Sequence, residues 1–224
     1  MTLALQTTCD ASPAEAETVR IKRLGQVDYT TTWEAMRRFT DERDAATPDE
    51  IWLLEHPPVY TLGQAGSPEH LLRKNAIPLI KIDRGGQITY HGPGQLVAYL
   101  LIDLARRGLK VREQIRLMEQ ALINCLAEYG IEAVRKDGAP GVYARDAKIA
   151  ALGLRVRRGC SYHGLALNVN MDLAPFAAIN PCGYAGMTTT QLADFGVTDD
   201  CERVAPRLLH HVLTLLPPVK DRGG

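Results

Sequence analysis

The chain has 224 residues, of which 46% are hydrophobic, and its 26 basic and 26 acidic side chains give a formal net charge of zero. This composition suffices for one buried core, and it excludes nucleic-acid binding driven by the overall charge of the protein. No apolar run approaches the roughly 20 residues that span a bilayer, and residues 1–17 do not resemble a secretory signal. Five scattered cysteines without a Cys-x-x-Cys pair indicate reduced thiols, so we expect a cytoplasmic protein without a membrane partner.

The hydrophobic pattern predicts one mixed α/β domain at residues 19–218, between a loose tail at 1–18 and a short tail at 219–224. The first half predicts strands at 19–24, 51–55 and 59–63 and a helix at 29–43. The second half predicts a helix at 111–129 and strands at 141–144, 148–156 and 162–169. Residues 188–191 have capping-box spacing and predict the start of a short helix that ends at Gly196, and a last helix is expected around 208–216.

A polar, glycine-dense stretch at residues 83–95 lies between the apolar runs 77–82 and 96–102. Glycines at 85, 86, 92 and 94 alternate there with a guanidinium, a phenol, an imidazole, a hydroxyl and two amides. Glycine lets a backbone approach a ligand closely, so the stretch is a candidate binding site. The alternative is an ordinary glycine-rich hairpin loop, which composition alone favours.

Cys182 is the strongest candidate nucleophile. Pro181 and Gly183 flank it and predict a tight turn that would present the thiol to a substrate. A cysteine needs a neighbouring base or cation to be a thiolate at neutral pH, and the candidates are His91, His163 and Lys148. Lys148 emerges from the apolar strand 148–154, so its side chain lies either on the exposed side or in a pocket, where it could serve as a base.

Three other cysteines have simpler interpretations. Cys125 lies on the apolar stripe of the helix at 111–129, and Cys201 lies among acidic residues that would suppress its thiolate form. Cys160 and His163 have a spacing found in zinc sites, but no second ligand pair stands near them, so a plain loop is the preferred interpretation and no metal is expected.

Residues 84–95 read Arg-Gly-Gly-Gln-Ile-Thr-Tyr-His-Gly-Pro-Gly-Gln, which resembles the signature of the bacterial lipoyl(octanoyl)transferases. The resemblance continues through segments 137–143, 148–155, 163–169 and 180–183 and covers nearly all of residues 19–218. Several long motifs in one order are far more specific than one glycine loop. The resemblance implies an α/β (α+β) fold of mixed sheets with flanking helices, similar to the catalytic domains of biotin and lipoate protein ligases.

The family's activity implies that an octanoyl group passes from octanoyl-acyl carrier protein to a lysine of lipoyl domains, in lipoate biosynthesis. The acceptors would be the lipoyl domains of 2-oxoacid dehydrogenases and the glycine cleavage H protein. The enzyme would act as a monomer, without ATP or another cofactor. By resemblance, Cys182 would carry the acyl group as a thioester, and Lys148 would lower the pKa of that cysteine. The implied substrate-binding residues are Arg84, Gly85, Gly86, Gln87, Ile88, Thr89, Tyr90, His91, Ala151, Leu152, Gly153, Gly164, Leu165 and Ala166.

Three alternatives stay open at this point. An ATP-dependent lipoate or biotin-type ligase would need an adenylate site, and no Gly-Arg-Gly-Arg loop is present. A thioester hydrolase would use Cys182 with His91 or His163 and release free octanoate. A non-catalytic acyl-binding module would use the pocket without the thiol.

A basic strip offers a candidate surface for the acidic carrier protein. Residues 154–158 alternate, so Arg155 and Arg157 share one face of the strand. Together with Arg106, Arg107 and Lys110, they could steer an acidic partner toward the site. The alternative is an ordinary solvated strand face.

Overall fold

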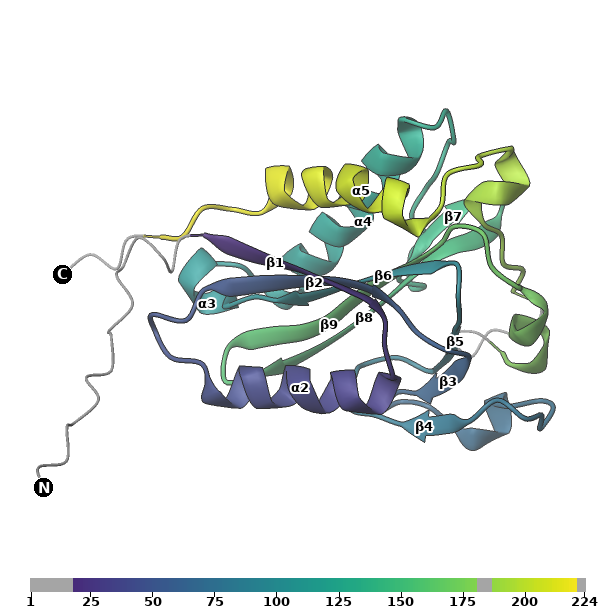
Figure 1. Cartoon of the computed structure of the whole chain (residues 1–224), viewed down its shortest axis with the longest axis horizontal. Helices are drawn as coiled ribbons and strands as arrows, with labels where there is room; N and C mark the ends of the chain where they lie inside the picture. Colours follow the sequence, from purple (N-terminus) through teal and green to yellow (C-terminus); the bar gives the residue numbers. More distant parts are fainter. Residues whose placement is uncertain (1–17, 181–186, 221–224) are drawn as a thin grey trace, which may run out of the picture.

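The computed structural model describes residues 18–180 and 187–220, with a six-stranded sheet at its centre (Figure 1). The strand order is β1-β2-β6-β9-β8-β7, and only the β1–β2 pair among these neighbours is parallel. The strands are β1 (Val19–Gln26), β2 (Asp49–Glu55), β6 (Gln95–Leu101), β7 (Val142–Ala144), β8 (Ala147–Arg157) and β9 (Cys160–Asn168). The predicted mixed α/β architecture is confirmed.

Helices cover both faces of this sheet. Helices α4 (Val111–Ala127) and α5 (Cys201–Leu215) lie on one face and α2 (Tyr29–Glu42) on the other (Figure 1). Alternation along β2 serves both layers: Ile51 and Leu53 pack in the core beneath α4 and α5, whereas Trp52 and Leu54 pack with α2. Cys125 is fully buried on the α4 stripe, as predicted, and burial raises the pKa of its thiol to about 12.

A second, three-stranded sheet lies beside the first. Its order is β4-β3-β5, formed by β4 (Leu79–Lys81), β3 (Val59–Leu62) and β5 (Ile88–His91). The stretch at 83–95 is therefore not a hairpin loop between two paired strands. Four of its thirteen residues form β5, which pairs with β3. The flanking strands β4 and β6 belong to different sheets. The stretch thus carries the chain from one sheet to the other.

Short helices complete the described chain. They are α3 (Leu104–Arg107), η1 (Pro68–His70), η2 (Ala174–Ala178) and η4 (Leu192–Phe195). The capping box predicted at 188–191 is wrong by one turn. It is formed at 191–194 instead, where the Asp194 carboxylate accepts from the Gln191 N–H at 3.2 Å. The predicted stop at Gly196 is confirmed by its left-handed conformation. Within residues 18–180 and 187–220, no helix combines the length and apolarity needed to cross a bilayer.

A buried ionic cluster joins β2 to α3. The Asp49 carboxylate is fully buried and pairs with Arg43 at 2.7 Å, Arg106 at 2.8 Å and Arg107 at 2.6 Å. Burial by itself would raise the pKa of Asp49, but the hydrogen bonds from the Asp103 N–H, Arg107 and Arg43 outweigh it and hold that pKa below its ordinary value. Arg106 and Arg107 are therefore structural.

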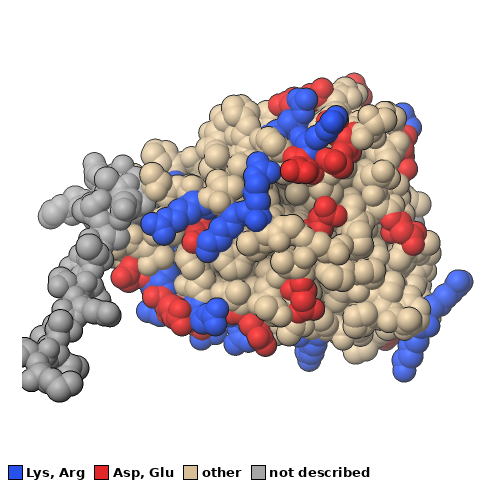
Figure 2. Space-filling model, in the orientation of Figure 1, with Lys and Arg blue, Asp and Glu red and all other residues tan. Residues whose placement is uncertain are grey.

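The predicted basic strip is consequently wrong in part. Arg106 and Arg107 are 5% and 3% exposed, because Asp49 draws them into the interior, and so they add nothing to a surface field. Arg157 pairs with Asp41 at 2.7 Å, and Arg155 donates to Gln64 at 2.7 Å. Figure 2 shows positive and negative side chains interspersed with broad uncharged areas on the face that it presents.

Candidate active site

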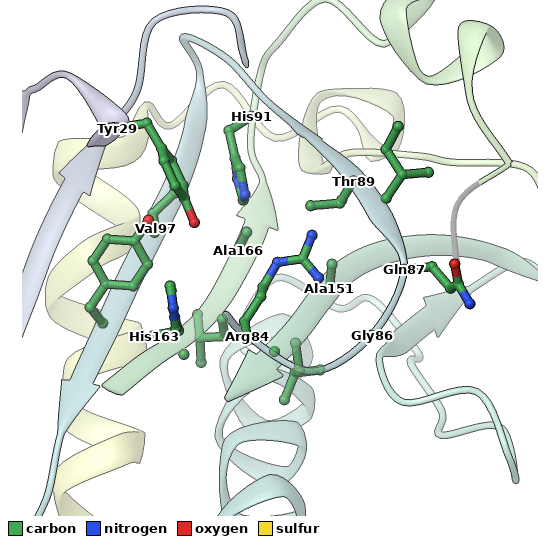
Figure 3. A pocket seen from close by; sticks show the side chains of 16 residues that line it. Tyr29, Arg84, Gly86, Gln87, Thr89, His91, Val97, Ala151, His163 and Ala166 are labelled. Atoms are coloured by element: carbon green, nitrogen blue, oxygen red, sulfur yellow. The ribbon is translucent and has the colours of Figure 1, made fainter. Parts of the chain in front are cut away.

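A cavity of about 60 Å³ lies where the two sheets meet. The glycine-rich segment and β5 form one wall, strands β6, β8 and β9 form the other, and the start of α2 closes one end (Figure 3). The lining residues are Tyr29, Arg84, Gly86, Gln87, Ile88, Thr89, His91, Val97, Tyr99, Ala151, Leu152, Gly153, His163, Gly164, Leu165 and Ala166.

Small residues on β8 and β9 create this space. Ala151 pairs with Ala166 and Gly153 pairs with Gly164, so four small residues lie side by side in the wall. A Cβ at Gly153 would lie 2.8 Å from Arg84 Cδ, so only glycine lets the arginine stem cross here. The register of the two strands is consistent with the predicted role of these residues, which is to leave space for a ligand in the pocket.

Arg84 spans the cavity, with its guanidinium held by protein oxygens (Figure 3). One nitrogen donates to the Thr61 carbonyl at 2.8 Å and to Thr61 Oγ1 at 2.9 Å, and another donates to the Gly85 carbonyl at 3.0 Å. The residue is only 8% exposed. These bonds fix a positive charge in the middle of the cavity wall.

The predicted substrate-binding residues line the cavity, except for Gly85 and Tyr90. Gly85 donates its N–H to the Leu154 carbonyl at 2.9 Å and borders a separate surface groove. Tyr90 points the other way, since Thr89 and His91 occupy the cavity face of β5. Its ring packs against Tyr60 and Phe176 in the core of the small sheet, with centroids 5.6 and 5.4 Å away.

The side chain of Lys148 points from β8 into the interior and is 3% exposed. This excludes the alternative that it lies on the exposed side of the strand. Its ammonium lies 5.4 Å from the centre of the Tyr143 ring. A Cβ at Gly141 would clash with Lys148 Cε, so the glycine makes room for the lysine stem. Lys148 lines a small space that shares Thr89 and Ala151 with the main cavity, and this contact places the lysine at that end.

Cys182 lies outside the described residues, but the chain on both sides of it is anchored. Before it, the Asn180 N–H donates to the His70 carbonyl at 2.9 Å. After it, Lys148 exchanges backbone hydrogen bonds with the following segment: its N–H donates to Thr188 at 2.9 Å, and the Thr190 N–H donates to its carbonyl at 3.0 Å. The segment that follows the predicted nucleophile therefore runs alongside the predicted lysine.

Beside the predicted His91, the opposite end of the cavity holds Tyr29, Tyr99 and His163, which the sequence did not indicate as pocket residues. Tyr29 stacks on His91 with ring centroids 5.7 Å apart, and Tyr99 meets His163 edge-on at 6.0 Å. His56 lies just behind them and bonds the Tyr99 hydroxyl at 2.7 Å. From the sequence, His163 was considered only as a base for Cys182 or as a zinc ligand. The other half of that zinc spacing, Cys160, was predicted in a loop, but it is a buried residue of strand β9.

Burial keeps these imidazoles neutral. It lowers the pKa of His56 to about 4 and that of His91 to about 3, and it lowers the pKa of His163 as well. Burial also raises the pKa of Tyr29 and Tyr99, so both phenols keep their protons. This end of the cavity is thus polar but uncharged at neutral pH, apart from Arg84.

Lowering the pH from about 6.5 to about 4 is expected to destabilise the protein. An unfolded histidine has a pKa of about 6.5, above the folded values of about 4 for His56 and about 3 for His91. In this window the unfolded chain binds protons that the folded chain excludes, so the free energy of unfolding falls as the pH is lowered. For His56 the full loss is about 3 kcal/mol.

Urea denaturation at steps across this pH range measures the effect. The His56→Gln variant should show a shallower pH dependence, because one of the buried histidines that titrate on unfolding is gone. Asp49 and Asp83, whose folded pKa values are lowered, contribute only below about pH 5, so the range from about pH 6.5 to about pH 5 is free of their effect. A free energy of unfolding that stays constant over this range would contradict the buried, neutral histidines.

Comparison with known proteins assigns the family. The family model for the lipoyl protein ligase A/B catalytic domain matches residues 28–213. A protein named octanoyltransferase from Azoarcus sp. (strain BH72) is 70% identical over 221 residues, which cover 97% of each chain. The chain belongs to the octanoyltransferase family. The family that the motifs of residues 84–183 resemble is therefore confirmed, and this octanoyltransferase-family chain is an acyltransferase.

Two solved structures share the fold. Lipoate-protein ligase A bound with ATP superposes with a TM-score of 0.72 at 18% identity, covering 88% of this chain and 85% of that one. The biotin protein ligase from Aquifex aeolicus in complex with biotin and ATP gives a TM-score of 0.57 at 14% identity, covering 88% and 70%. The predicted likeness to biotin and lipoate protein ligase catalytic domains is confirmed at the level of fold.

Proposed function

We propose that this chain transfers an octanoyl group from octanoyl-acyl carrier protein to a lysine of lipoyl domains through a thioester on Cys182. The observation that carries the proposal is the position of Lys148. A buried amine lies at one end of a cavity with small residues in its wall, against the segment that follows Cys182. The acceptors would be lipoyl domains of 2-oxoacid dehydrogenases and the glycine cleavage H protein.

In the first half-reaction, the Cys182 thiolate attacks the carbonyl carbon of the donor thioester. The Lys148 amine accepts the thiol proton, and the resulting ammonium stabilises the thiolate. The bond to the carrier sulfur breaks, and that sulfur takes the proton from the Lys148 ammonium and leaves as a thiol, which returns Lys148 to the neutral amine. One thioester replaces another, so the step needs no ATP and no cofactor.

In the second half-reaction, the neutral amine of the lipoyl-domain lysine attacks the Cys182 thioester. The carbon–sulfur bond breaks as the amide forms, and the proton released by the amine ends on the Cys182 sulfur, with Lys148 as the relay. The small residues of β8 and β9 leave room for the alkyl chain, which extends from Lys148 past Thr89 and Ala151.

An ATP-free transfer assay separates this function from its alternatives. The purified chain is mixed with octanoyl-acyl carrier protein and an apo lipoyl domain, and the masses of both proteins are followed. Octanoylation of the lipoyl domain without ATP is the expected result. Free octanoate without octanoylated domain would indicate a hydrolase, a strict ATP requirement would indicate a ligase, and unchanged masses would indicate a binding module; each of these would contradict the proposal.

A further inference from the structure

The inner end of the cavity has an unexpected chemistry for a space that receives an alkyl chain. Figure 3 shows Arg84 crossing between Thr89 and Ala151 on one side and Tyr29 and His163 on the other. Lys148 lies at the Thr89–Ala151 end, so the methyl end of a bound acyl chain points toward the tyrosine and the histidine. Hydroxyl and imidazole groups lie there beside the apolar Val97.

The backbone is strained in order to place His163 in this cavity. Its φ is +61°, a left-handed conformation that few residues other than glycine adopt within a strand. Normal alternation would put Tyr162 and His163 on opposite faces of β9. Instead their rings stack with centroids 5.0 Å apart at 26°, and both bond the Asp83 carboxylate. Strain of this kind is typical of functional positions.

The hydrogen-bond partners assign the tautomer of His163. Asp83 accepts from Trp33 Nε1 at 2.8 Å and from the Tyr162 hydroxyl, and it contacts His163 Nε2 at 3.0 Å. A carboxylate accepts hydrogen bonds, so Nε2 carries the proton and Nδ1 of the neutral ring holds a lone pair. Among residues 18–180 and 187–220, no hydrogen-bond partner reaches His163 Nδ1.

The hydrogen-bond partners of His91 assign its tautomer as well. Gln95 Nε2 donates to the Tyr90 carbonyl at 3.3 Å and to Asn168 Oδ1 at 2.9 Å, which turns Gln95 Oε1 toward His91 Nδ1 at 2.7 Å. Nδ1 therefore carries the proton, and His91 Nε2 is an acceptor. Two buried imidazoles that line the same end of one cavity thus each keep a lone pair, and methylene groups cannot satisfy either of them.

We propose that His91 and His163 limit the length of the acyl chain by holding water at the inner end of the cavity. Water donates two hydrogen bonds, which matches the two acceptors. An octanoyl chain ends before the water, whereas a longer chain must displace it and leave both acceptors unpaired. Longer acyl chains are thus disfavoured by the free energy of displacing this water rather than by steric exclusion. This inference rests on the proposed function.

The test compares chain lengths in matched variants. The kcat/KM values for octanoyl-, decanoyl- and dodecanoyl-carrier are measured for the wild type, His91→Leu and Val97→Ala. His91→Leu removes an acceptor, and its decanoyl-to-octanoyl ratio of kcat/KM should rise by about tenfold or more. Val97→Ala adds volume to the same cavity without removing an acceptor, so its ratio should change by less than about threefold.

The reverse pattern, with the ratio raised in Val97→Ala and unchanged in His91→Leu, would overturn the inference and assign the limit to volume. If His91→Leu does not fold, nitrogen-15 NMR of the wild type decides. The proton is expected on Nε2 of His163 and on Nδ1 of His91, and the opposite tautomer at either residue would overturn the inference. Failure of the wild type to transfer octanoyl at all would instead contradict the proposed function.

Discussion

Replacing Lys148 with methionine is expected to lower kcat/KM for octanoyl transfer by about a thousandfold, the middle of the range for loss of a proton-transferring group. Methionine keeps the length and apolar stem of the side chain but has no amine. Lys148 is 3% exposed, and Gly141 provides the room for its stem, so the variant should keep its fold while losing the proposed proton acceptor.

Lys136 supplies a matched control. Its ammonium lies 4.9 Å from the centre of the same Tyr143 ring, but its side chain is 39% exposed and bridges Asp146 at 3.1 Å. Lys136→Met should stay within about twofold of the wild type, because exposed ion pairs contribute little. Steady-state transfer with saturating lipoyl domain measures both variants. Equal activities of the two variants would remove Lys148 from the mechanism.

Replacing Asp49 with asparagine is expected to lower the free energy of unfolding by about 3–5 kcal/mol, the cost of breaking a buried ion pair from one side. The Asp49 carboxylate is the shared partner of Arg43, Arg106 and Arg107, and all three guanidinium groups are buried with it. An asparagine amide leaves these cations without a compensating charge in the interior.

Urea denaturation of Asp49→Asn and Asp41→Asn makes the comparison. Asp41 pairs with Arg157 at 2.7 Å, but both side chains are more than a third exposed, so its loss should cost less than about 1 kcal/mol. A destabilisation of similar size in the two variants would show that the buried cluster does not carry the stability assigned to it.

Local pattern predicted the elements well where one face of a helix or strand is buried. The α4 stripe that contains Cys125, the strand pair β8–β9 and the stop at Gly196 all follow from residues close in the sequence. The residues at 151–153 and 164–166 were assigned to a pocket by resemblance, and the strand register places the two segments side by side. The predicted roles of Lys148 and Cys182 stay predictions.

What the sequence did not predict depends on partners far along the chain. Arg106 and Arg107 have the pattern of an exposed basic pair, but Asp49, more than fifty residues earlier, binds both of them in the interior. His163 faces the cavity because of its positive φ and because of Asp83, eighty residues before it. A positive φ at a glycine can be anticipated, but nothing in the residue type announces it at a histidine.

The acyl-enzyme intermediate is the most direct test of the account. The chain is incubated with octanoyl-acyl carrier protein, without ATP and without a lipoyl domain, and its intact mass is recorded before and after treatment with hydroxylamine. We predict one octanoyl adduct that is labile to hydroxylamine, absent from Cys182→Ser, and discharged to a lipoyl domain added afterwards. An adduct that persists in Cys182→Ser, or transfer that proceeds with no adduct on the wild-type chain, would contradict the thioester on Cys182.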